Sequence, residues 1–267
     1  MRWDGLRHAP GVVDAVTALL AAREGFPALH LSGAAVSAVA LGRPDLGHVH
    51  ATDIARIAST ITSVVDVPLV ADADTGYGGV LQVARTVELY AQAGVAALHL
   101  EDQVAPKRCG HLAGKEILPI DEAVAKVRAA VDVGGVSIIA RTDALGVLGL
   151  DEAVRRAHRY AEAGADLVFV EGARTHDELA AVGLPQVLNR SEAGPPDALT
   201  DPDLAELDVR LVIHPVSALL TMMAAAGSAY AAIRATSRAD VPMASWTDLT
   251  DLLGLPGELA REGTYAP

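Results

Sequence analysis

The segment Lys107-Arg108-Cys109-Gly110-His111 combines the residue types of a reactive thiol site. Cys109 is the only cysteine of the chain, and three basic residues share its segment. Cationic neighbours lower the pKa of a thiol, and they also attract anionic substrates. The sequence therefore predicts that Cys109, Lys107 and His111 act in catalysis, with Cys109 as a nucleophile, a proton donor or a redox sensor.

Three carboxylates follow two successive apolar segments, Asp72 and Asp74 after the first and Glu101 after the second. Side chains alternate along a strand, so Asp72 and Asp74 point to the same side if the strand continues that far. Converging carboxylates are costly unless protons or a cation neutralise them. Oxygen ligands without cysteine or histidine favour Mg²⁺, with Mn²⁺ as an alternative. The sequence predicts this metal site, and the simpler interpretation is that the aspartates cap the next helix.

An internal repeat indicates how these residues are positioned. Residues 90–101 resemble residues 160–171, and each copy shows a helical pattern, a glycine and a short apolar segment. A glycine ends a helix well because it adopts the left-handed conformation cheaply, and short apolar segments are typical of buried parallel strands. A repeat of about 70 residues corresponds to two strand-and-helix units of ordinary size.

The whole chain contains eight such units. The predicted strands are residues 6–9, 28–32, 68–72, 97–101, 137–141, 167–171, 186–189 and 209–214. The predicted helices are residues 12–23, 52–64, 80–93, 121–131, 150–163, 175–182, 202–206 and 217–236. This alternation favours an α/β fold, a (β/α)8 TIM barrel over residues 1–240 with a helical tail, 241–267, in the same domain. A doubly wound open sheet is the alternative, but no GxGxxG motif follows the first strand.

The strand ends allow a check of the barrel prediction. Active sites of such barrels lie at the carboxyl ends of the strands, where loops follow. Six predicted strands end there in a polar residue: Ser32, Asp72, Glu101, Arg141, Glu171 and Asn189. The loop at residues 102–118 is long enough to be a lid, with Gly110 and Gly114 as hinges. Asp45 either caps a helix or lies at the rim of the site.

The composition limits the class of protein. The chain has 267 residues, is 51% hydrophobic and carries a formal net charge of −13, which argues against nucleic-acid and anionic membrane partners. A single cysteine suits a reducing cytosol, so we expect a cytoplasmic protein. We see no signal peptide and no apolar stretch of about 20 residues that suggests a membrane span.

Several motifs together resemble one family. They lie at residues 31–33, 41–47, 71–78, 99–103, 107–111, 140–144 and 169–171. With these motifs the chain resembles the isocitrate lyase/phosphoenolpyruvate mutase superfamily over nearly its whole length. The Lys-Arg-Cys-Gly-His loop is similar to that of the 2-methylisocitrate lyase branch, which includes 2,3-dimethylmalate lyases.

The resemblance implies Mg²⁺-dependent cleavage of a carbon–carbon bond in a 2-hydroxy di- or tricarboxylate, giving a 2-oxo acid and a carboxylic acid. It implies three groups of residues: Asp72, Asp74 and Glu101 for the metal, Ser32, Gly33, Asp45 and Arg141 for the 2-oxo acid, and Glu171, Asn189, Lys107, Gly110 and His111 for the departing acid. Cys109 would be the general acid. The C-terminal helices would be swapped between subunits of a homotetramer, a dimer of dimers.

Two departures from the branch change the expectations. His30 stands where these lyases usually have a tyrosine, so His30 is the candidate base. Leu112 stands where an arginine is usual, which favours a dicarboxylate smaller than 2-methylisocitrate. The alternatives are a phosphonomutase of the carboxyvinyl-carboxyphosphonate or phosphoenolpyruvate type, an oxaloacetate decarboxylase, and a non-catalytic homologue that binds a metabolite.

Overall fold

Eight parallel strands form the centre of the protein, which is known here from a computed structural model that describes residues 2–265. Their order in the sheet is β1-β8-β7-β6-β5-β4-β3-β2. A parallel bridge between Gly11 and His30 joins the two outer strands and closes the barrel. The strands are β1 (Arg7–Pro10), β2 (Leu29–Leu31), β3 (Leu69–Asp72), β4 (Ala97–Glu101), β5 (Ser137–Thr142), β6 (Leu167–Val170), β7 (Gln186–Asn189) and β8 (Val209–His214). The predicted (β/α)8 barrel is confirmed.

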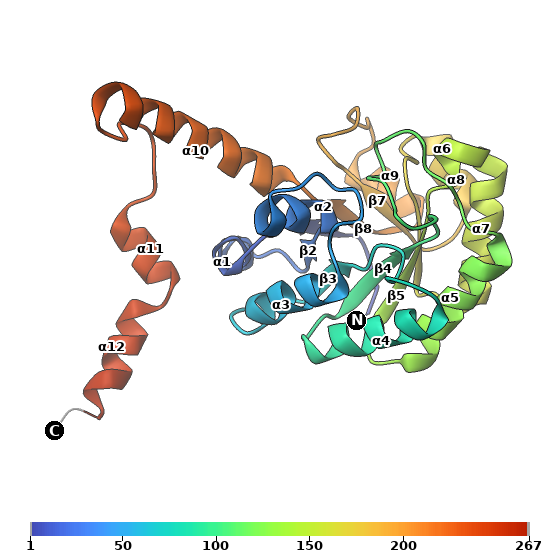
Figure 1. Cartoon of the computed structure of the whole chain (residues 1–267), viewed down its shortest axis with the longest axis horizontal. Helices are drawn as coiled ribbons and strands as arrows, with labels where there is room; N and C mark the ends of the chain where they lie inside the picture. The colour runs from blue at the N-terminus through green and yellow to red at the C-terminus, as the bar shows by residue number, and fades with distance from the viewer. Residues whose placement is uncertain (1, 266–267) are drawn as a thin grey trace.

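Helices surround the barrel in the order that the sequence predicts (Figure 1). They are α1 (Ala15–Arg23), α3 (Ala51–Thr62), α4 (Val80–Gln92), α5 (Ile120–Val133), α7 (Leu150–Glu162), α8 (His176–Val182) and α9 (Asp201–Glu206). Three shorter elements, α2 (Gly33–Val36), the π-helix η1 (Ser37–Leu41) and α6 (Leu145–Leu148), were not predicted. They lie in the loops after β2 and β5, close to the carboxyl ends of these strands.

The interior of the barrel is packed with apolar side chains from alternate strand positions. Val70, Ile139, Phe169, Leu211 and Ile213 belong to one buried cluster. Parallel strands are covered on both faces, so they appear in the sequence as continuous apolar runs. That continuity is why the predicted strand bounds agree with the observed ones to within two residues at each end.

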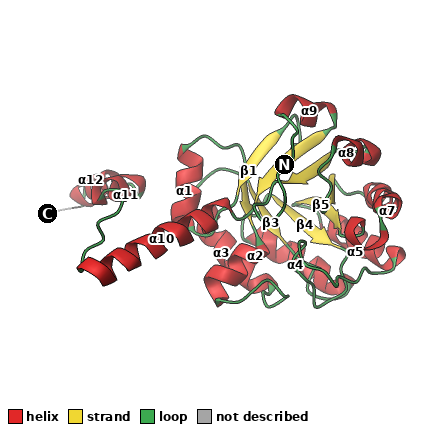
Figure 2. Ribbon diagram, turned by 90° about the horizontal axis from the view of Figure 1, so that it is seen from above, coloured by secondary structure: helices red, strands yellow, loops and turns green. Residues whose placement is uncertain are grey.

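The helix after β8 does not cover the barrel. Helix α10 (Ser217–Thr236) has the predicted extent, but it projects away from the strands (Figures 1 and 2). Helices α11 (Trp246–Leu252) and α12 (Leu255–Gly263) follow as an arm, in which α11 contacts α1. No residue of α10 is buried. The barrel domain of this chain is therefore covered by helices α1 to α9, and the eighth helix is directed outward.

Helix α10 is also long and apolar enough to cross a membrane, by length and composition alone, with a hydropathy of 1.3. This departs from the expectation that no segment of the chain resembles a membrane span. A single such helix is weak support for a span, because helices of soluble proteins also have this length and composition.

Candidate active site

A cavity of about 90 Å³ lies at the carboxyl ends of the strands, where the barrel predicts an active site. Most of the predicted site residues line it: His30, Ser32, Asp45, Asp72, Lys107, Cys109, Gly110, His111, Arg141, Glu171 and Asn189. Gly33, Asp74 and Glu101 are buried behind this lining. Residues that are far apart in the sequence thus meet in one pocket, as the strand ends predicted.

One wall of the cavity is apolar and was not predicted. Ile213, at the end of β8, and the next residues Pro215 and Val216 form this wall, and Ala34 and Ala193 also line the cavity. Ser191 lines the cavity beside Asn189. The sequence gives no chemical signal for these residues, because apolar side chains at a strand end look like ordinary core. The pocket thus offers charged groups and an apolar surface to one ligand.

The carboxylates Asp72 and Asp74 lie beside Gly33 at the end of β3. Asp72 accepts hydrogen bonds from the backbone N–H of Gly33 and of Asp74, both at 3.0 Å. A methyl group on Gly33 would come within 2.9 Å of Asp72 Oδ2 and 3.1 Å of Asp74 Oδ1, so glycine permits this close approach. The strand ends at Asp72, and Asp74 turns with φ 44°, so the two side chains meet through a turn rather than through strand alternation.

Charge at this place fits a bound cation. Burial and the neighbouring Asp72 raise the pKa of Asp74 to about 7, and burial raises the pKa of Glu101 well above its ordinary range. Within residues 2–265, no hydrogen-bond donor reaches the buried Oε1 of Glu101. The same residues contain no cluster of three histidine, cysteine or acidic side chains that could ligate a metal directly. The carboxylates therefore fit an ion held mainly through water, as the resemblance implies.

Lys107 provides part of the positive charge in the site. Its Nζ lies 2.6 Å from Asp45 Oδ1 and 2.9 Å from Asp74 Oδ1, and its side chain is buried. These ion pairs join the loop that carries Cys109 to the loop after β2 and to the turn after β3. Asp45 also lines the cavity, which agrees with the interpretation that it lies at the rim of the site.

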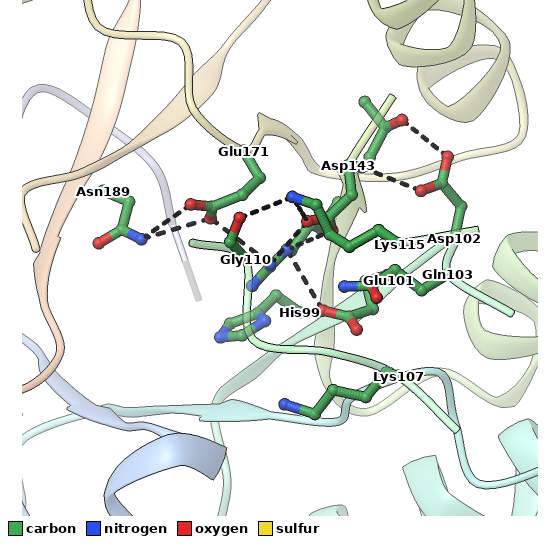
Figure 3. A network of polar contacts seen from close by, with 12 residues as sticks. His99, Glu101, Asp102, Gln103, Lys107, Gly110, Lys115, Asp143, Glu171 and Asn189 are labelled. Carbon is green, nitrogen blue, oxygen red and sulfur yellow. Dashed lines mark hydrogen bonds and ion pairs between the residues drawn. The ribbon is translucent and has the colours of Figure 1, made fainter. Parts of the chain in front are cut away.

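Arg141 is the centre of a polar network with Glu101, Asp143 and Glu171, three residues that are labelled in Figure 3. It donates two hydrogen bonds to Asp143, from Nε at 2.9 Å and from Nη2 at 3.1 Å. Its Nε lies 3.3 Å from Glu101, and its Nη2 lies 3.6 Å from Glu171. Three buried carboxylates therefore fix the guanidinium at the floor of the pocket, where it can bind a carboxylate in two-point fashion.

A second layer of buried residues holds Asp143. The carboxylate of Asp102 accepts hydrogen bonds from the Asp143 backbone N–H, Thr142, Arg156 and Tyr160 at 2.7–3.0 Å. The sequence analysis did not predict this network. Asp102 directly follows the predicted rim residue Glu101, and Asp143 lies two residues after the predicted rim residue Arg141. The signal was an acidic residue directly after each of two strands, because a buried carboxylate is unusual without a partner.

The Cys109 thiol lines the pocket in its protonated form. Burial raises the pKa of Cys109 above its ordinary value. The predicted lowering of this pKa by the loop cations is therefore wrong. The reason is geometric, because Lys107 is paired with carboxylates and the Arg108 side chain is exposed to solvent. His111 Nδ1 lies 3.8 Å from the sulfur. A protonated thiol can donate a proton, which favours one of the three roles predicted for Cys109.

The loop that carries Cys109 is held tightly. Gln103 pairs with the backbone of Arg108 through two hydrogen bonds of 2.9 Å, and the backbone N–H of Cys109 lies 3.3 Å from the carbonyl oxygen of Asp45. A methyl group on Gly110 would come within 2.7 Å of Arg141 Nη2 and 2.8 Å of Glu171 Cδ. Gly110 thus allows the loop to lie directly on the two side chains below it. Gly114 alone has the left-handed conformation expected of a hinge, with φ 80°.

His30 and His99 form a buried pair at the base of the pocket. Their Nε2 atoms are 3.0 Å apart, and His99 Nδ1 lies 3.4 Å from Asp72 Oδ1. Burial and the neighbouring His99 lower the pKa of His30 to about 3, so this ring is neutral. If the His99 Nδ1 proton faces Asp72, its Nε2 accepts the proton of His30 Nε2. The Nδ1 of His30 then carries a free lone pair.

Comparison with known proteins now decides the family. The family model described as phosphoenolpyruvate phosphomutase matches residues 5–234. The chain belongs to this family. It is 37% identical over 268 residues to a 2,3-dimethylmalate lyase from Eubacterium barkeri, across 97% of this chain and 93% of that protein. It is 44% identical over 214 residues to a 2-methylisocitrate lyase from Aeropyrum pernix, across 78% and 69%.

Solved structures place this phosphoenolpyruvate phosphomutase family member in the wider superfamily. A 2,3-dimethylmalate lyase, described as a PEP mutase/isocitrate lyase superfamily member, aligns with a TM-score of 0.91 and 36% identity, over 98% of this chain and 91% of its own. An oxaloacetate acetylhydrolase bound to 3,3-difluorooxalacetate gives 0.91 and 35%, over 97% and 92%. A phosphonopyruvate hydrolase complex with oxalate and Mg²⁺ gives 0.86 and 32%, over 97% and 94%. The protein is an enzyme of this superfamily, and its curated relatives include lyases.

Proposed function

We propose that the protein is a Mg²⁺-dependent carbon–carbon lyase that cleaves an alkyl-substituted 2-hydroxy dicarboxylate to a 2-oxo acid and a carboxylic acid. One observation carries the proposal. The protonated thiol of Cys109 lines the same cavity as Arg141, Glu171 and Asn189. A cleavage that leaves electrons on carbon needs a proton donor at this place, next to groups that bind two carboxylates.

The pocket suits a small substrate with an apolar substituent. Its volume of about 90 Å³ and the wall of Ile213, Pro215 and Val216 leave room for alkyl groups rather than for a third carboxylate. Leu112 agrees with this preference, because it is 46% exposed and brings no positive charge. A 2,3-dimethylmalate type of substrate therefore fits better than the tricarboxylate 2-methylisocitrate.

The residues of the chain can carry out the proton transfers. Arg141 holds the carboxylate that stays with the 2-oxo product, and Ser32, which lines the same cavity, binds this product as well. His30 lines the cavity and is the candidate group to accept the proton of the substrate hydroxyl. The bond between C2 and C3 then breaks, its electron pair moves to the α-carbon of the departing acid, and Cys109 protonates that carbon. Glu171, Asn189 and His111 orient the departing carboxylate.

Asp72, Asp74 and Glu101 are the residues that would hold Mg²⁺, with Mn²⁺ as a possible replacement. When bound, the ion supplies positive charge that stabilises the oxygen of the 2-oxo product. The three carboxylates lie close together, and Lys107 and Arg141 offset part of their negative charge, so a bound cation would stabilise them further. A superfamily neighbour bound to oxalate and Mg²⁺ supports this assignment.

The thiol also favours a lyase over a phosphonomutase. Moving a phosphoryl group between oxygen and carbon leaves no carbanion to be protonated by the enzyme, so the half-buried, protonated thiol of Cys109 has no task there. A decarboxylation or hydrolysis of oxaloacetate does leave a carbanion. The thiol therefore does not distinguish a lyase from an enzyme that decarboxylates or hydrolyses oxaloacetate. Identification of the reaction products distinguishes them.

We expect purified protein with Mg²⁺ to release a 2-oxo acid from 2,3-dimethylmalate and to lose this activity in EDTA. Proton NMR measures the products, and the panel also contains 2-methylisocitrate, isocitrate and oxaloacetate. Release of oxalate or carbon dioxide from oxaloacetate as the main reaction would replace the lyase proposal. A phosphorus NMR experiment with phosphoenolpyruvate is the control, because a phosphonate signal would indicate a mutase. If EDTA does not lower the activity and added Mg²⁺ does not raise it, the proposed metal dependence is wrong.

We further propose that the enzyme is a cytoplasmic homo-oligomer, a dimer of dimers, in which α10 of one copy covers another copy. Helix α10 carries exposed large apolar side chains, among them Met223, Tyr230 and Ile233 at 65%, 71% and 46% exposure. Such a surface is unusual on a monomer. The barrel leaves the place of its own eighth helix open, so a second copy, rather than a membrane, is the fitting partner.

We expect Met223→Glu to weaken this assembly, because it places a charge on the apolar face of α10. Size-exclusion chromatography with light scattering should give a multiple of the 27.5 kDa chain mass for the original protein and a smaller mass for the variant. Glu258→Gln, on α12, removes a charge from the arm and is the control. A single-chain mass for the original protein would contradict the proposed assembly.

A further inference from the structure

A buried lysine links the catalytic loop to the floor of the pocket. The Nζ of Lys115 donates hydrogen bonds to the carbonyl oxygen of Gly110 at 2.6 Å and to Asp143 Oδ1 at 2.9 Å (Figure 3). Its side chain is 8% exposed. Lys115 does not line the cavity, so it has no direct contact with a ligand there.

The two acceptors of Lys115, the Gly110 carbonyl oxygen and the Asp143 carboxylate, both belong to elements that position site residues. Gly110 is the point at which the loop lies on Arg141 and Glu171, and Cys109 is the preceding residue. Asp143 is the carboxylate that binds Arg141 through two hydrogen bonds, and Asp102 holds its backbone. Lys115 is therefore attached on one side to the loop that carries Cys109 and on the other to the carboxylate that holds Arg141.

We propose that Lys115 is a positioning residue. By linking the Gly110 carbonyl oxygen to Asp143 through two hydrogen bonds, it fixes the distance between the Cys109 thiol and the substrate. The proposal rests on the proposed function, in which Cys109 protonates a carbanion bound beside Arg141. Other contacts of the loop, from Lys107 and Gln103, fix its first half, residues 103–109. Lys115 is the contact that ties the second half of the loop to the arginine.

The single cysteine makes a direct test possible, because every alkylation event reports on Cys109. We would measure the rate of modification by iodoacetamide in the presence of Mg²⁺ and oxalate. For Lys115→Met we expect alkylation to be about tenfold faster than in the original protein, because two charge-assisted hydrogen bonds that close the loop are lost. Removing a cation would by itself raise the pKa of the thiol and slow alkylation. A faster rate therefore reports opening of the loop.

Arg108→Met is the matched control, because it removes a cation next to Cys109 without removing a contact to Asp143. Its alkylation should be unchanged or slower. An equal or slower rate in Lys115→Met would overturn the proposal. If Lys115→Met does not fold, Lys115→Gln replaces it. This variant loses the charge and has a shorter side chain, so its alkylation should also be faster than that of the original protein. A rate equal to that of the original protein would overturn the proposal.

Turnover gives a second measurement when a substrate is known. For Lys115→Met we expect kcat to fall more than tenfold while KM changes less than threefold, because Lys115 does not touch the substrate. A purely structural lysine would lower the amount of folded enzyme and leave both constants of the remainder unchanged. Alkylation does not need a substrate, so the proposal stands or falls on it even if no compound of the panel is cleaved.

Discussion

Replacement of Cys109 by alanine should lower the rate of product formation by about 10²- to 10⁴-fold, the usual contribution of a general acid. The reason is that burial keeps this thiol protonated, next to the pocket where a carbanion would form. Steady-state kinetics with the best substrate of the NMR panel measures the effect. Cys109→Ser should be nearly as slow, because a hydroxyl has a much higher pKa than a thiol and gives up its proton poorly.

Ligand binding is the control for this prediction. In thermal unfolding experiments, oxalate with Mg²⁺ should stabilise Cys109→Ala as strongly as the original protein, because Arg141 and the carboxylates remain in place. Loss of binding together with loss of turnover would show that Cys109 shapes the pocket rather than donating a proton. Full turnover in Cys109→Ala would remove the thiol from the mechanism.

Replacement of Arg141 by methionine should abolish oxalate binding and destabilise the fold by about 3–5 kcal/mol. The guanidinium lies between the buried carboxylates of Glu101, Asp143 and Glu171, and its removal leaves them without their main positive partner. Urea unfolding measures the free energy of unfolding, and calorimetric titration measures oxalate binding. We expect the loss of unfolding free energy in Arg141→Met to be smaller near pH 4 than at pH 8, because protonated carboxylates repel one another less.

Two variants separate the causes. Arg141→Lys keeps a charge but loses the two-point geometry, so it should retain more stability than Arg141→Met while binding oxalate poorly. Arg155→Met removes an exposed arginine that is paired with Glu152 and should leave the unfolding midpoint unchanged. A small change of stability in Arg141→Met would mean that the three carboxylates are protonated or solvated without it.

The barrel and most of the residues at its rim were predictable from the sequence. The apolar runs indicate the strands, and the residue at the end of each run is the one that lies at the rim. Strands β4, β7 and β8 have the predicted bounds, since a buried parallel strand is one unbroken apolar run. Arg141, Glu171 and Asn189 meet because parallel strands end at one edge. No knowledge of side-chain direction was needed for either prediction.

The charge on the thiol was not predictable in the same way. It depends on whether Lys107 faces Cys109 or the carboxylates, and the spacing of residues along a loop does not determine this. The buried Asp102 network had the same difficulty, because its partners Arg156 and Tyr160 come from a helix more than 50 residues away in the sequence.

The pocket consists of two halves with different origins. Strands β2 to β5 and the Cys109 loop supply the groups that handle protons and charge, whereas the residues after β7 and β8, Ser191, Ala193, Pro215 and Val216, supply the surface that meets the rest of the ligand. Substitutions in the second half can therefore enlarge or reshape the range of accepted acids without disturbing the first. Substitutions that change the substrate range, whether natural or engineered, are therefore expected in the segments that follow β7 and β8.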